Sequence, residues 1–223
     1  MSRRKKRICV IGLGHFGWEL AVSLSQDCEV LAIDRDPEVV NAIAEWVPQA
    51  RALDVRDESA LASVLPEDVD EAVVSMGENL ESSILCTLYL KRLGVPFVWA
   101  KALSDDHAIV LKQVGADEVV FPERETARRL AARVANANLL DFVPLGVDYE
   151  VVKWRAPDSL NGQTLSDLKF RGRFGVYVLA VQRAGSNAVE FMPGPDCRLE
   201  AGDVLTVIGR RADVERLEKF AEE

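Results

Sequence analysis

Short apolar runs alternate with longer amphipathic runs along the first 136 residues of the chain. The apolar runs predict strands, and the amphipathic runs between them predict helices that cover a sheet. Strands are expected at residues 7–11, 29–33, 50–53, 71–75, 97–100 and 118–121. Helices are expected at residues 15–26, 37–45, 57–64, 79–93, 105–114 and 123–136. A strand followed each time by a helix predicts an α/β fold with a doubly wound parallel sheet.

Residues with capping and turn preferences mark several of the expected helix ends. Asp57 and Asp105 stand where a side chain can accept a bond from the first free amides of a helix. Gly94 and Gly115 directly follow helical runs, where glycine commonly ends a helix. These positions support the predicted division into helices and strands.

The pattern changes near residues 138–144, which indicates a domain boundary. Beyond them, strands are expected at residues 149–156, 175–182, 188–192 and 203–209, a short helix at 160–168 and a terminal helix at 213–222. We therefore predict a nucleotide-type α/β domain over residues 1–138 and a small α+β domain over residues 139–223.

The first apolar run leads directly into a glycine-rich turn, Gly12-Leu13-Gly14-His15-Phe16-Gly17. In a G-x-G-x-x-G turn the backbone approaches a pyrophosphate closely, because glycine has no Cβ, and helix amides face the negative charge. The second apolar run is followed by Asp34, 34 − 12 = 22 positions after Gly12, where a carboxylate can accept ribose hydroxyl groups. The sequence predicts nucleotide binding on a Rossmann-like sheet, and a tight turn without a ligand is the alternative.

The composition indicates an acidic protein that does not bind nucleic acid, because its net charge is −9 and phosphate binding needs a basic face. The scattered cysteines Cys9, Cys28, Cys86 and Cys197 indicate reduced thiols and a cytoplasmic location. No apolar stretch approaches the ~20 residues that cross a bilayer. Residues 3–7 form one basic block, expected to be a solvated chain end, with a membrane surface or a partner protein as alternatives.

Groups able to catalyse proton or hydride transfer are scarce in this sequence. His15 lies in the glycine-rich turn, and His107 is expected at the surface or in a cap. Tyr149 and Lys153 have the Y-x-x-x-K spacing of short-chain dehydrogenases, but a strand there would separate the two residues by ~13 Å. We therefore expect a sensor and not an enzyme, with an NAD(P)-dependent oxidoreductase and a free-standing nucleotide-binding scaffold as the alternatives.

Several segments together resemble the cytoplasmic gating subunits of bacterial potassium uptake systems, the KtrA/TrkA family built from RCK domains. The resemblance covers nearly the whole chain. It rests on the glycine-rich turn, Ala32-Ile33-Asp34, Ser75-Met76-Gly77-Glu78-Asn79, and residues 98–102, 115–123 and 171–175. The Gly-Ala-Asp sequence at residues 115–117, with Pro122-Glu123 behind it, is more specific than the glycine-rich turn.

The resemblance implies an RCK_N domain that binds ATP or ADP, with NAD(H) in some relatives, followed by an RCK_C domain. It also implies a homo-oligomer, an octameric ring of dimers, beneath a K+-conducting membrane subunit of the KtrB/TrkH type. The chain would then lie in the cytoplasm, peripheral at the inner face of the cell membrane. The nucleotide site implied by the resemblance consists of Gly12, Gly14, His15, Phe16, Gly17, Asp34, Arg35, Asp54, Val55, Ser75, Met76, Gly77, Lys101 and Glu123.

Three of these residues carry distinct implied roles. Asp54 lies near the adenine, Lys101 near the phosphates, and Glu123 at a subunit interface where a divalent cation can bridge it to ATP. The alternatives are a loop cap for Asp54, a solubilising surface charge for Lys101 and a favourable helix-dipole contact for Glu123.

Two further expectations concern ligand preference. Histidine at position 15 replaces an arginine that is frequent in KtrA-like proteins, so the preference for ATP over ADP is expected to be weaker and pH-dependent. In the second domain the resemblance implies a cyclic di-AMP site at a symmetric dimer interface, formed by Arg171, Phe174 and Pro193. Surface charge is the alternative for Arg171.

Overall fold

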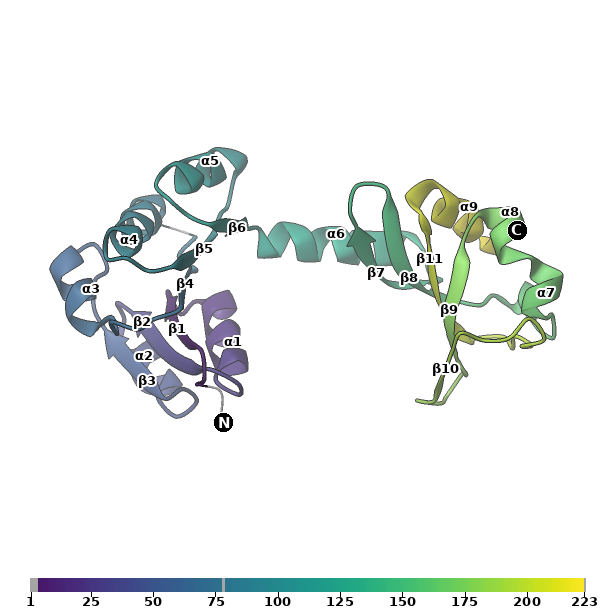
Figure 1. Cartoon of the computed structure of the whole chain (residues 1–223), viewed down its shortest axis with the longest axis horizontal. Helices are drawn as coiled ribbons and strands as arrows, with labels where there is room; N and C mark the ends of the chain where they lie inside the picture. Colours follow the sequence, from purple (N-terminus) through teal and green to yellow (C-terminus); the bar gives the residue numbers. More distant parts are fainter. Residues whose placement is uncertain (1–3, 78, 223) are drawn as a thin grey trace. The chain divides into compact units, whose positions relative to one another are not determined.

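The computed structural model describes residues 4–77 and 79–222, which fall into two compact units, Met1–Glu123 and Arg124–Glu223 (Figure 1). The division falls in the first turn of helix α6 (Pro122–Ala135). The expected boundary between a domain of residues 1–138 and a domain of residues 139–223 stays a prediction. Arg3 and Glu78, named above, lie outside the described residues.

The first unit is a parallel sheet with the strand order β3-β2-β1-β4-β5-β6. The chain therefore starts in the middle of the sheet and builds outward twice, so the predicted doubly wound fold is confirmed. The strands are β1 (Arg7–Ile11), β2 (Glu29–Asp34), β3 (Gln49–Ala52), β4 (Glu71–Val74), β5 (Phe97–Lys101) and β6 (Glu118–Val120). The helices before α6 are α1 (His15–Leu24), α2 (Pro37–Ile43), α3 (Glu58–Val64), α4 (Leu80–Arg92) and α5 (Asp105–Gln113).

Helices cover both faces of this sheet, so both faces are buried. Successive side chains of a strand point to opposite faces. In β1, Cys9 and Ile11 pack with residues of α3, α4 and α5, whereas Ile8 and Val10 pack with residues of α1 and α2. Burial raises the pKa of the Cys9 thiol to about 12, so this cysteine behaves as an apolar core residue. The uninterrupted apolar sequence of residues 8–11 follows from burial on both faces.

The helix ends agree with the sequence predictions at most positions. Asp57 caps α3 by accepting bonds from the amides of Ser59 and Ala60. The prediction that Asp105 caps α5 is wrong, because Ser104 is the capping residue and Asp105 begins the helix. His107 is also not a surface residue: it is buried in α5, and burial lowers the pKa of its imidazole.

The second unit contains an antiparallel sheet with the strand order β10-β9-β11-β8-β7. Its strands are β7 (Leu139–Leu145), β8 (Tyr149–Arg155), β9 (Tyr177–Gln182), β10 (Val189–Phe191) and β11 (Val204–Arg210). Its helices are the larger part of α6, α7 (Leu165–Leu168), α8 (Phe170–Phe174) and α9 (Arg211–Glu222), with a short 3-10 turn at Asp158–Leu160. The small α+β domain is confirmed.

The structure corrects two expectations about the second unit. Strand β7, which pairs with β8 along residues 139–145, was not among the predicted strands. The helix expected over residues 160–168 is divided into the 3-10 turn and α7, because Thr164 forms a new helix N-terminus with a capping box to Asp167.

Asp203 is a buried charge at the start of β11. Its carboxylate accepts bonds from the guanidinium Nη1 of Arg183 at 2.7 Å and from the amides of Ala184 and Glu200 at 3.0 Å each. Three donors, one of them cationic, compensate for the loss of water around the carboxylate. This residue therefore fixes the loops on both sides of the strands β9 and β11.

We expect Asp203→Asn to lower the free energy of unfolding by about 2 kcal/mol, because an amide replaces one acceptor by a donor that faces Arg183. Denaturant unfolding monitored by circular dichroism measures this loss. Asp158→Asn, at an exposed position, is the matched control and is expected to change stability little. Equal stability of the two variants would contradict a structural role of Asp203.

Candidate functional site

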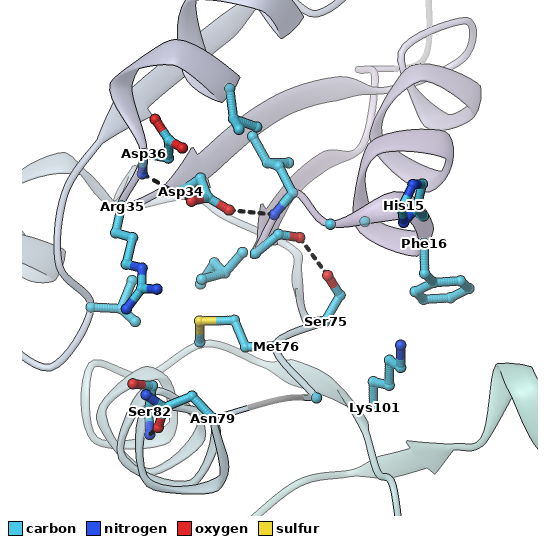
Figure 2. Close-up of a pocket in the computed structure, with 18 of the residues that line it drawn as sticks. His15, Phe16, Asp34, Arg35, Asp36, Ser75, Met76, Asn79, Ser82 and Lys101 are labelled. Carbon is cyan, nitrogen blue, oxygen red and sulfur yellow. Dashed lines mark hydrogen bonds between the residues drawn. The ribbon is translucent and has the colours of Figure 1, made fainter.

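A cleft of about 470 Å³ lies at the carboxyl ends of the parallel strands in the first unit (Figure 2). Strand order reverses between β1 and β4, and ligands of doubly wound sheets bind at this switch point. The structure brings together every residue that the sequence predicted for the nucleotide site. The cleft is lined by Gly12, Gly14, His15, Phe16, Gly17, Asp34, Arg35, Asp54, Val55, Ser75, Met76, Gly77, Lys101 and Glu123.

Other lining residues were not predicted, namely Ile11, Leu13, Asp36, Val39, Leu53, Arg56, Asn79 and Ser82. Most of them are neighbours in sequence of a predicted residue. Asn79 and Ser82 form the N-terminal end of α4, where Asn79 accepts a bond from the amide of Ser82. The pairing of β1 with β4 brings this helix end to the cleft. The sequence signals for it were the pattern of a strand, a loop and a helix, and the segment that ends in Asn79 and carries part of the family resemblance.

The glycine-rich turn is packed tightly against the end of β4. Gly12 has a φ of +87°, and a Cβ there would lie 2.5 Å from Cγ of Met76. A Cβ on Gly17 would collide with the carbonyl oxygen of Gly12 and with Oγ of Ser75. The hydroxyl of Ser75 donates to that same carbonyl. Gly12 and Gly17 are therefore required by the fold itself.

Gly14 differs from the other two glycines of the motif. Its φ of −62° is open to any residue, and apart from its chain neighbours no atom of the described residues lies within 4 Å of the position where a Cβ would stand. Packing within the protein therefore does not require glycine at this position. Because Gly14 lines the cleft, the missing Cβ leaves room for a group that enters from outside, as a pyrophosphate does in G-x-G-x-x-G turns.

The N-terminus of α1 opens into the same cleft. Gly14 is its capping residue and offers no side chain, so no side-chain oxygen caps the first amides of the helix. Free amides and the positive end of the helix dipole favour an anion at this place. The exposed His15 occupies the first helical position and Phe16 the second (Figure 2).

Asp34 connects the glycine-rich turn with the start of α2 (Figure 2). One carboxylate oxygen accepts a bond from the amide of Leu13 at 2.6 Å, and the other accepts one from the amide of Asp36 at 2.9 Å. A carboxylate oxygen accepts more than one hydrogen bond. Asp34 is therefore oriented by the backbone and can still accept the hydroxyls of a ribose.

Lys101 contributes a positive charge to the cleft, on the side away from Asp34 (Figure 2). Its side chain is only 12% exposed, and its Nζ lies 5.7 Å from the centre of the Phe16 ring. It forms an ion pair with Glu123, the second residue of α6, and this contact lowers the pKa of the Glu123 carboxyl. Lys101 is thus paired with a residue in the first turn of α6, the helix that continues into the second unit.

Asp54 and Arg56 form a pair in the wall of the cleft. The guanidinium of Arg56 lowers the pKa of the Asp54 carboxyl to about 2, with a smaller contribution from Arg35. Asp54 therefore stays ionised over the physiological pH range.

Arg171 and Phe174, two of the residues expected for a cyclic dinucleotide, lie in the short helix α8. Phe174 is 7% exposed and packs against Phe170 and Phe220, so its ring belongs to the core and is not a stacking surface within one chain. The guanidinium of Arg171 lies 5.2 Å from the centre of the Tyr177 ring. Pro193 follows β10 and is half-buried. The dinucleotide site stays a prediction.

Among residues 4–77 and 79–222, no group of three or more His, Cys, Asp or Glu side chains could hold a metal ion. A divalent cation at Glu123 would need further oxygen ligands, such as those of a phosphate. Tyr149 and Lys153 both lie in strand β8, as predicted, so one helical turn does not bring them together. In the same part of the chain, no helix is long and apolar enough to cross a membrane.

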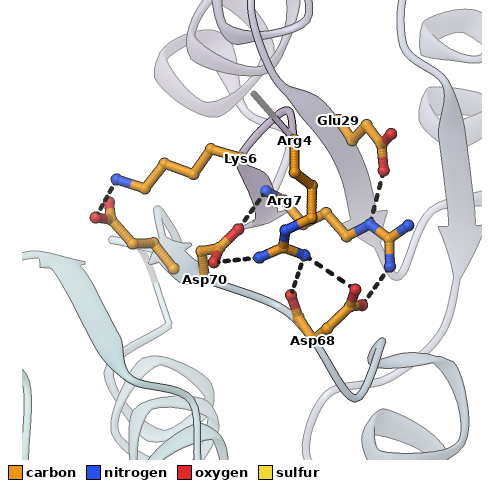
Figure 3. Close-up of polar contacts among 7 residues, drawn as sticks. Arg4, Lys6, Arg7, Glu29, Asp68 and Asp70 are labelled. Carbon is orange, nitrogen blue, oxygen red and sulfur yellow. Dashed lines mark hydrogen bonds and ion pairs between the residues drawn. The ribbon is translucent and has the colours of Figure 1, made fainter. Parts of the chain in front are cut away.

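The basic block at the start of the chain lies at the amino ends of the strands, the opposite edge of the sheet. Arg4 forms ion pairs with Asp68 and Asp70 at 2.9 Å and 2.7 Å (Figure 3). Arg7 pairs with Glu29 at 2.7 Å and with Asp68, and Lys6 pairs with Glu71 (Figure 3). Arg4 and Lys6 are exposed and Arg7 is partly exposed, as expected for a solvated end, but these residues are not frayed, because each is held by ion pairs within the unit.

The sheet order and the glycine-rich cleft at its switch point define the first unit as a Rossmann-type domain. Family models match the chain as a TrkA-N domain over residues 8–122 and a TrkA-C domain over residues 154–222. The chain belongs to the Ktr/TrkA family of potassium uptake proteins.

Two relatives come from Bacillus subtilis (strain 168). Ktr system potassium uptake protein C is 38% identical over 216 residues, covering 96% of this chain and 97% of the relative. Ktr system potassium uptake protein A is 32% identical over 216 residues and 96% of both chains. The similarity therefore extends over both units of this chain and nearly the whole length of each relative.

Solved structures of the GsuK channel have the same fold. One matches 99% of this chain and 40% of the channel chain with a TM-score of 0.70 and 17% identity. A GsuK channel bound to NAD matches with a TM-score of 0.64 and 16% identity over 99% of this chain and 40% of the other. GsuK bound to ADP matches with a TM-score of 0.51 and 16% identity over 59% of this chain and 35% of the other.

We expect Gly14→Ala to weaken binding of an adenine nucleotide at least about tenfold and to lower the melting temperature only slightly, because its methyl group enters the open cleft and alanine is a poorer helix cap than glycine. Titration calorimetry and thermal unfolding of the same protein measure both quantities. Gly194→Ala, also an unstrained glycine with open surroundings but in the second unit, is the control and is expected to change neither. An unchanged affinity of Gly14→Ala would argue against a phosphate at this turn.

Proposed function

We propose that this protein is the nucleotide-sensing regulatory subunit of a bacterial potassium uptake system. It binds ATP or ADP in the cleft of the first unit and controls a K+-conducting membrane partner of the KtrB/TrkH type. It has no catalytic activity of its own. The observation that carries this proposal is the cleft at Gly14, where an uncapped helix N-terminus, Asp34 and Lys101 converge in a Ktr/TrkA family member.

The residues divide the work of binding between the parts of a nucleotide. The amides at the start of α1 bind the phosphates, and Asp34 accepts the ribose hydroxyls. Lys101 exchanges its ion pair with Glu123 for a contact with the phosphates, whose charge it neutralises. Because Glu123 belongs to the first turn of α6, this exchange connects the bound phosphate with the helix that leads to the second unit.

The remaining parts of the proposal rest on the family membership. The subunits form a homo-oligomer, an octameric ring of dimers, located in the cytoplasm at the inner face of the membrane. A divalent cation bridges Glu123 to ATP, and NAD(H) is a second candidate for the cleft, since GsuK has been solved with NAD and with ADP. Cyclic di-AMP is proposed for the dimer interface of the second unit near Arg171.

A ligand screen by thermal unfolding tests the proposal. A ligand that binds only the native state raises the melting temperature, and ATP and ADP are expected to do so at millimolar concentration. A shift with NADH alone would mean that the ligand is NAD(H) and not ATP or ADP. No shift with ATP, ADP or NADH would contradict nucleotide sensing. Co-purification with a K+-conducting membrane protein separates a gating subunit from a free-standing scaffold.

We expect Lys101→Met to weaken ATP binding about tenfold or more, because a buried charge-assisted hydrogen bond to phosphate is lost. Lys112→Met removes the same charge at an exposed position outside the cleft and is expected to leave the affinity unchanged. Calorimetric titration of both variants compares them. If both lose affinity equally, the effect is one of net charge and Lys101 has no specific role.

His15 is expected to make the preference between ATP and ADP depend on pH. More positive charge at position 15 favours the additional phosphate of ATP, so the ratio of ATP to ADP affinity is expected to be higher at pH 6 than at pH 8. His15→Arg should raise this ratio and remove its pH dependence, since arginine stays charged. Titrations of both nucleotides at the two pH values provide the test, and identical ratios in the unmodified protein would contradict it.

A further inference from the structure

The Asp54–Arg56 pair holds a guanidinium group in a fixed plane in the wall of the cleft. Nε of Arg56 lies 3.0 Å from both carboxylate oxygens of Asp54, and Nη2 makes a further bond to one of them. The backbone amide of Arg56 donates to the same carboxylate at 3.0 Å. Side-chain and backbone contacts together fix the position of the guanidinium relative to the end of β3.

This pair lies at the end of the cleft where the base of a bound nucleotide is expected. A nucleotide with its phosphates at the N-terminus of α1 and its ribose at Asp34 extends its base from β2 toward the end of β3. The segment that follows β3 lines the cleft there with Leu53, Asp54, Val55 and Arg56. Apolar side chains alternate there with the two charged ones, and this arrangement fits the flat, weakly polar face of a purine.

We propose that the guanidinium plane of Arg56 stacks against the nucleobase of the bound nucleotide, and that Asp54 is the positioning residue that orients it. This inference rests on the proposed nucleotide binding. The edge of a guanidinium pairs with a carboxylate while its face stacks on an aromatic ring, and the two contacts do not compete. Asp54, expected from the family resemblance to lie near the adenine, then acts on the base through Arg56.

Two features favour stacking over a phosphate contact for Arg56. Asp54 compensates the charge of the guanidinium and thereby lowers its attraction for a further anion. The anion-binding elements of the cleft, the uncapped end of α1 and Lys101, belong to other walls than the segment after β3. Arg56 therefore contributes to recognition of the base, while the phosphates are bound elsewhere.

The test compares ATP with inorganic tripolyphosphate, which has the same phosphate chain but no base. Arg56→Lys keeps the charge and removes the plane, and Arg56→Gln removes the charge as well. Both variants are expected to bind ATP about tenfold more weakly, because stacking of a base on a planar side chain is lost. Their affinity for tripolyphosphate is expected to equal that of the unmodified protein.

Arg92→Gln is the matched control, since Arg92 is an exposed arginine that pairs with the carboxylate of Glu58 and lies outside the cleft. It is expected to bind both ligands normally. Melting temperatures without ligand verify that all variants are folded.

Three results would overturn the inference. Full ATP affinity in both Arg56 variants would mean that Arg56 only closes the turn with Asp54. An equal loss for ATP and tripolyphosphate would make Arg56 a phosphate ligand. A failure of the unmodified protein to bind ATP, ADP or NADH would overturn the proposed function as well, whereas the first two results leave it intact.

Discussion

The close contact between the glycine-rich turn and the end of β4 determines the geometry of the first unit. Gly17 brings α1 against the carbonyl of Gly12, and Ser75 donates its hydroxyl to that carbonyl. A side chain larger than a hydrogen atom at position 17 would force helix and strand apart. The same contact directs the N-terminus of α1 into the cleft, so folding and binding depend on one arrangement.

Charge is distributed over the two edges of the sheet in different ways. At the amino edge, Arg4, Lys6 and Arg7 pair with carboxylates, and their charges are compensated within the unit. At the carboxyl edge, the uncapped end of α1 stands open, and Lys101 has a partner that belongs to the connecting helix α6. An anion entering the cleft can therefore change contacts of α6 without disturbing the sheet.

The sequence predicted the first unit well because periodicity and glycine spacing report directly on a sheet that is buried on both faces. It missed β7, whose exposed half carries no clear alternation, and it placed one helix where Thr164 starts a new one. All residues predicted for the nucleotide site line the cleft, since the carboxyl ends of parallel strands meet there. Arg56 was missed because its importance depends on a side-chain contact with Asp54, which spacing alone does not reveal.

The central claim is that the turn at Gly14 and the first amides of α1 receive the phosphates of a nucleotide. Hydrogen exchange of the full chain, measured by mass spectrometry with and without saturating ADP, tests this claim most directly. We expect peptides that contain residues 12–17 to exchange more slowly with ADP, because the amides at the helix N-terminus become hydrogen-bonded to phosphate oxygens. Unchanged exchange in this segment, with protection only elsewhere in the chain, would contradict the account.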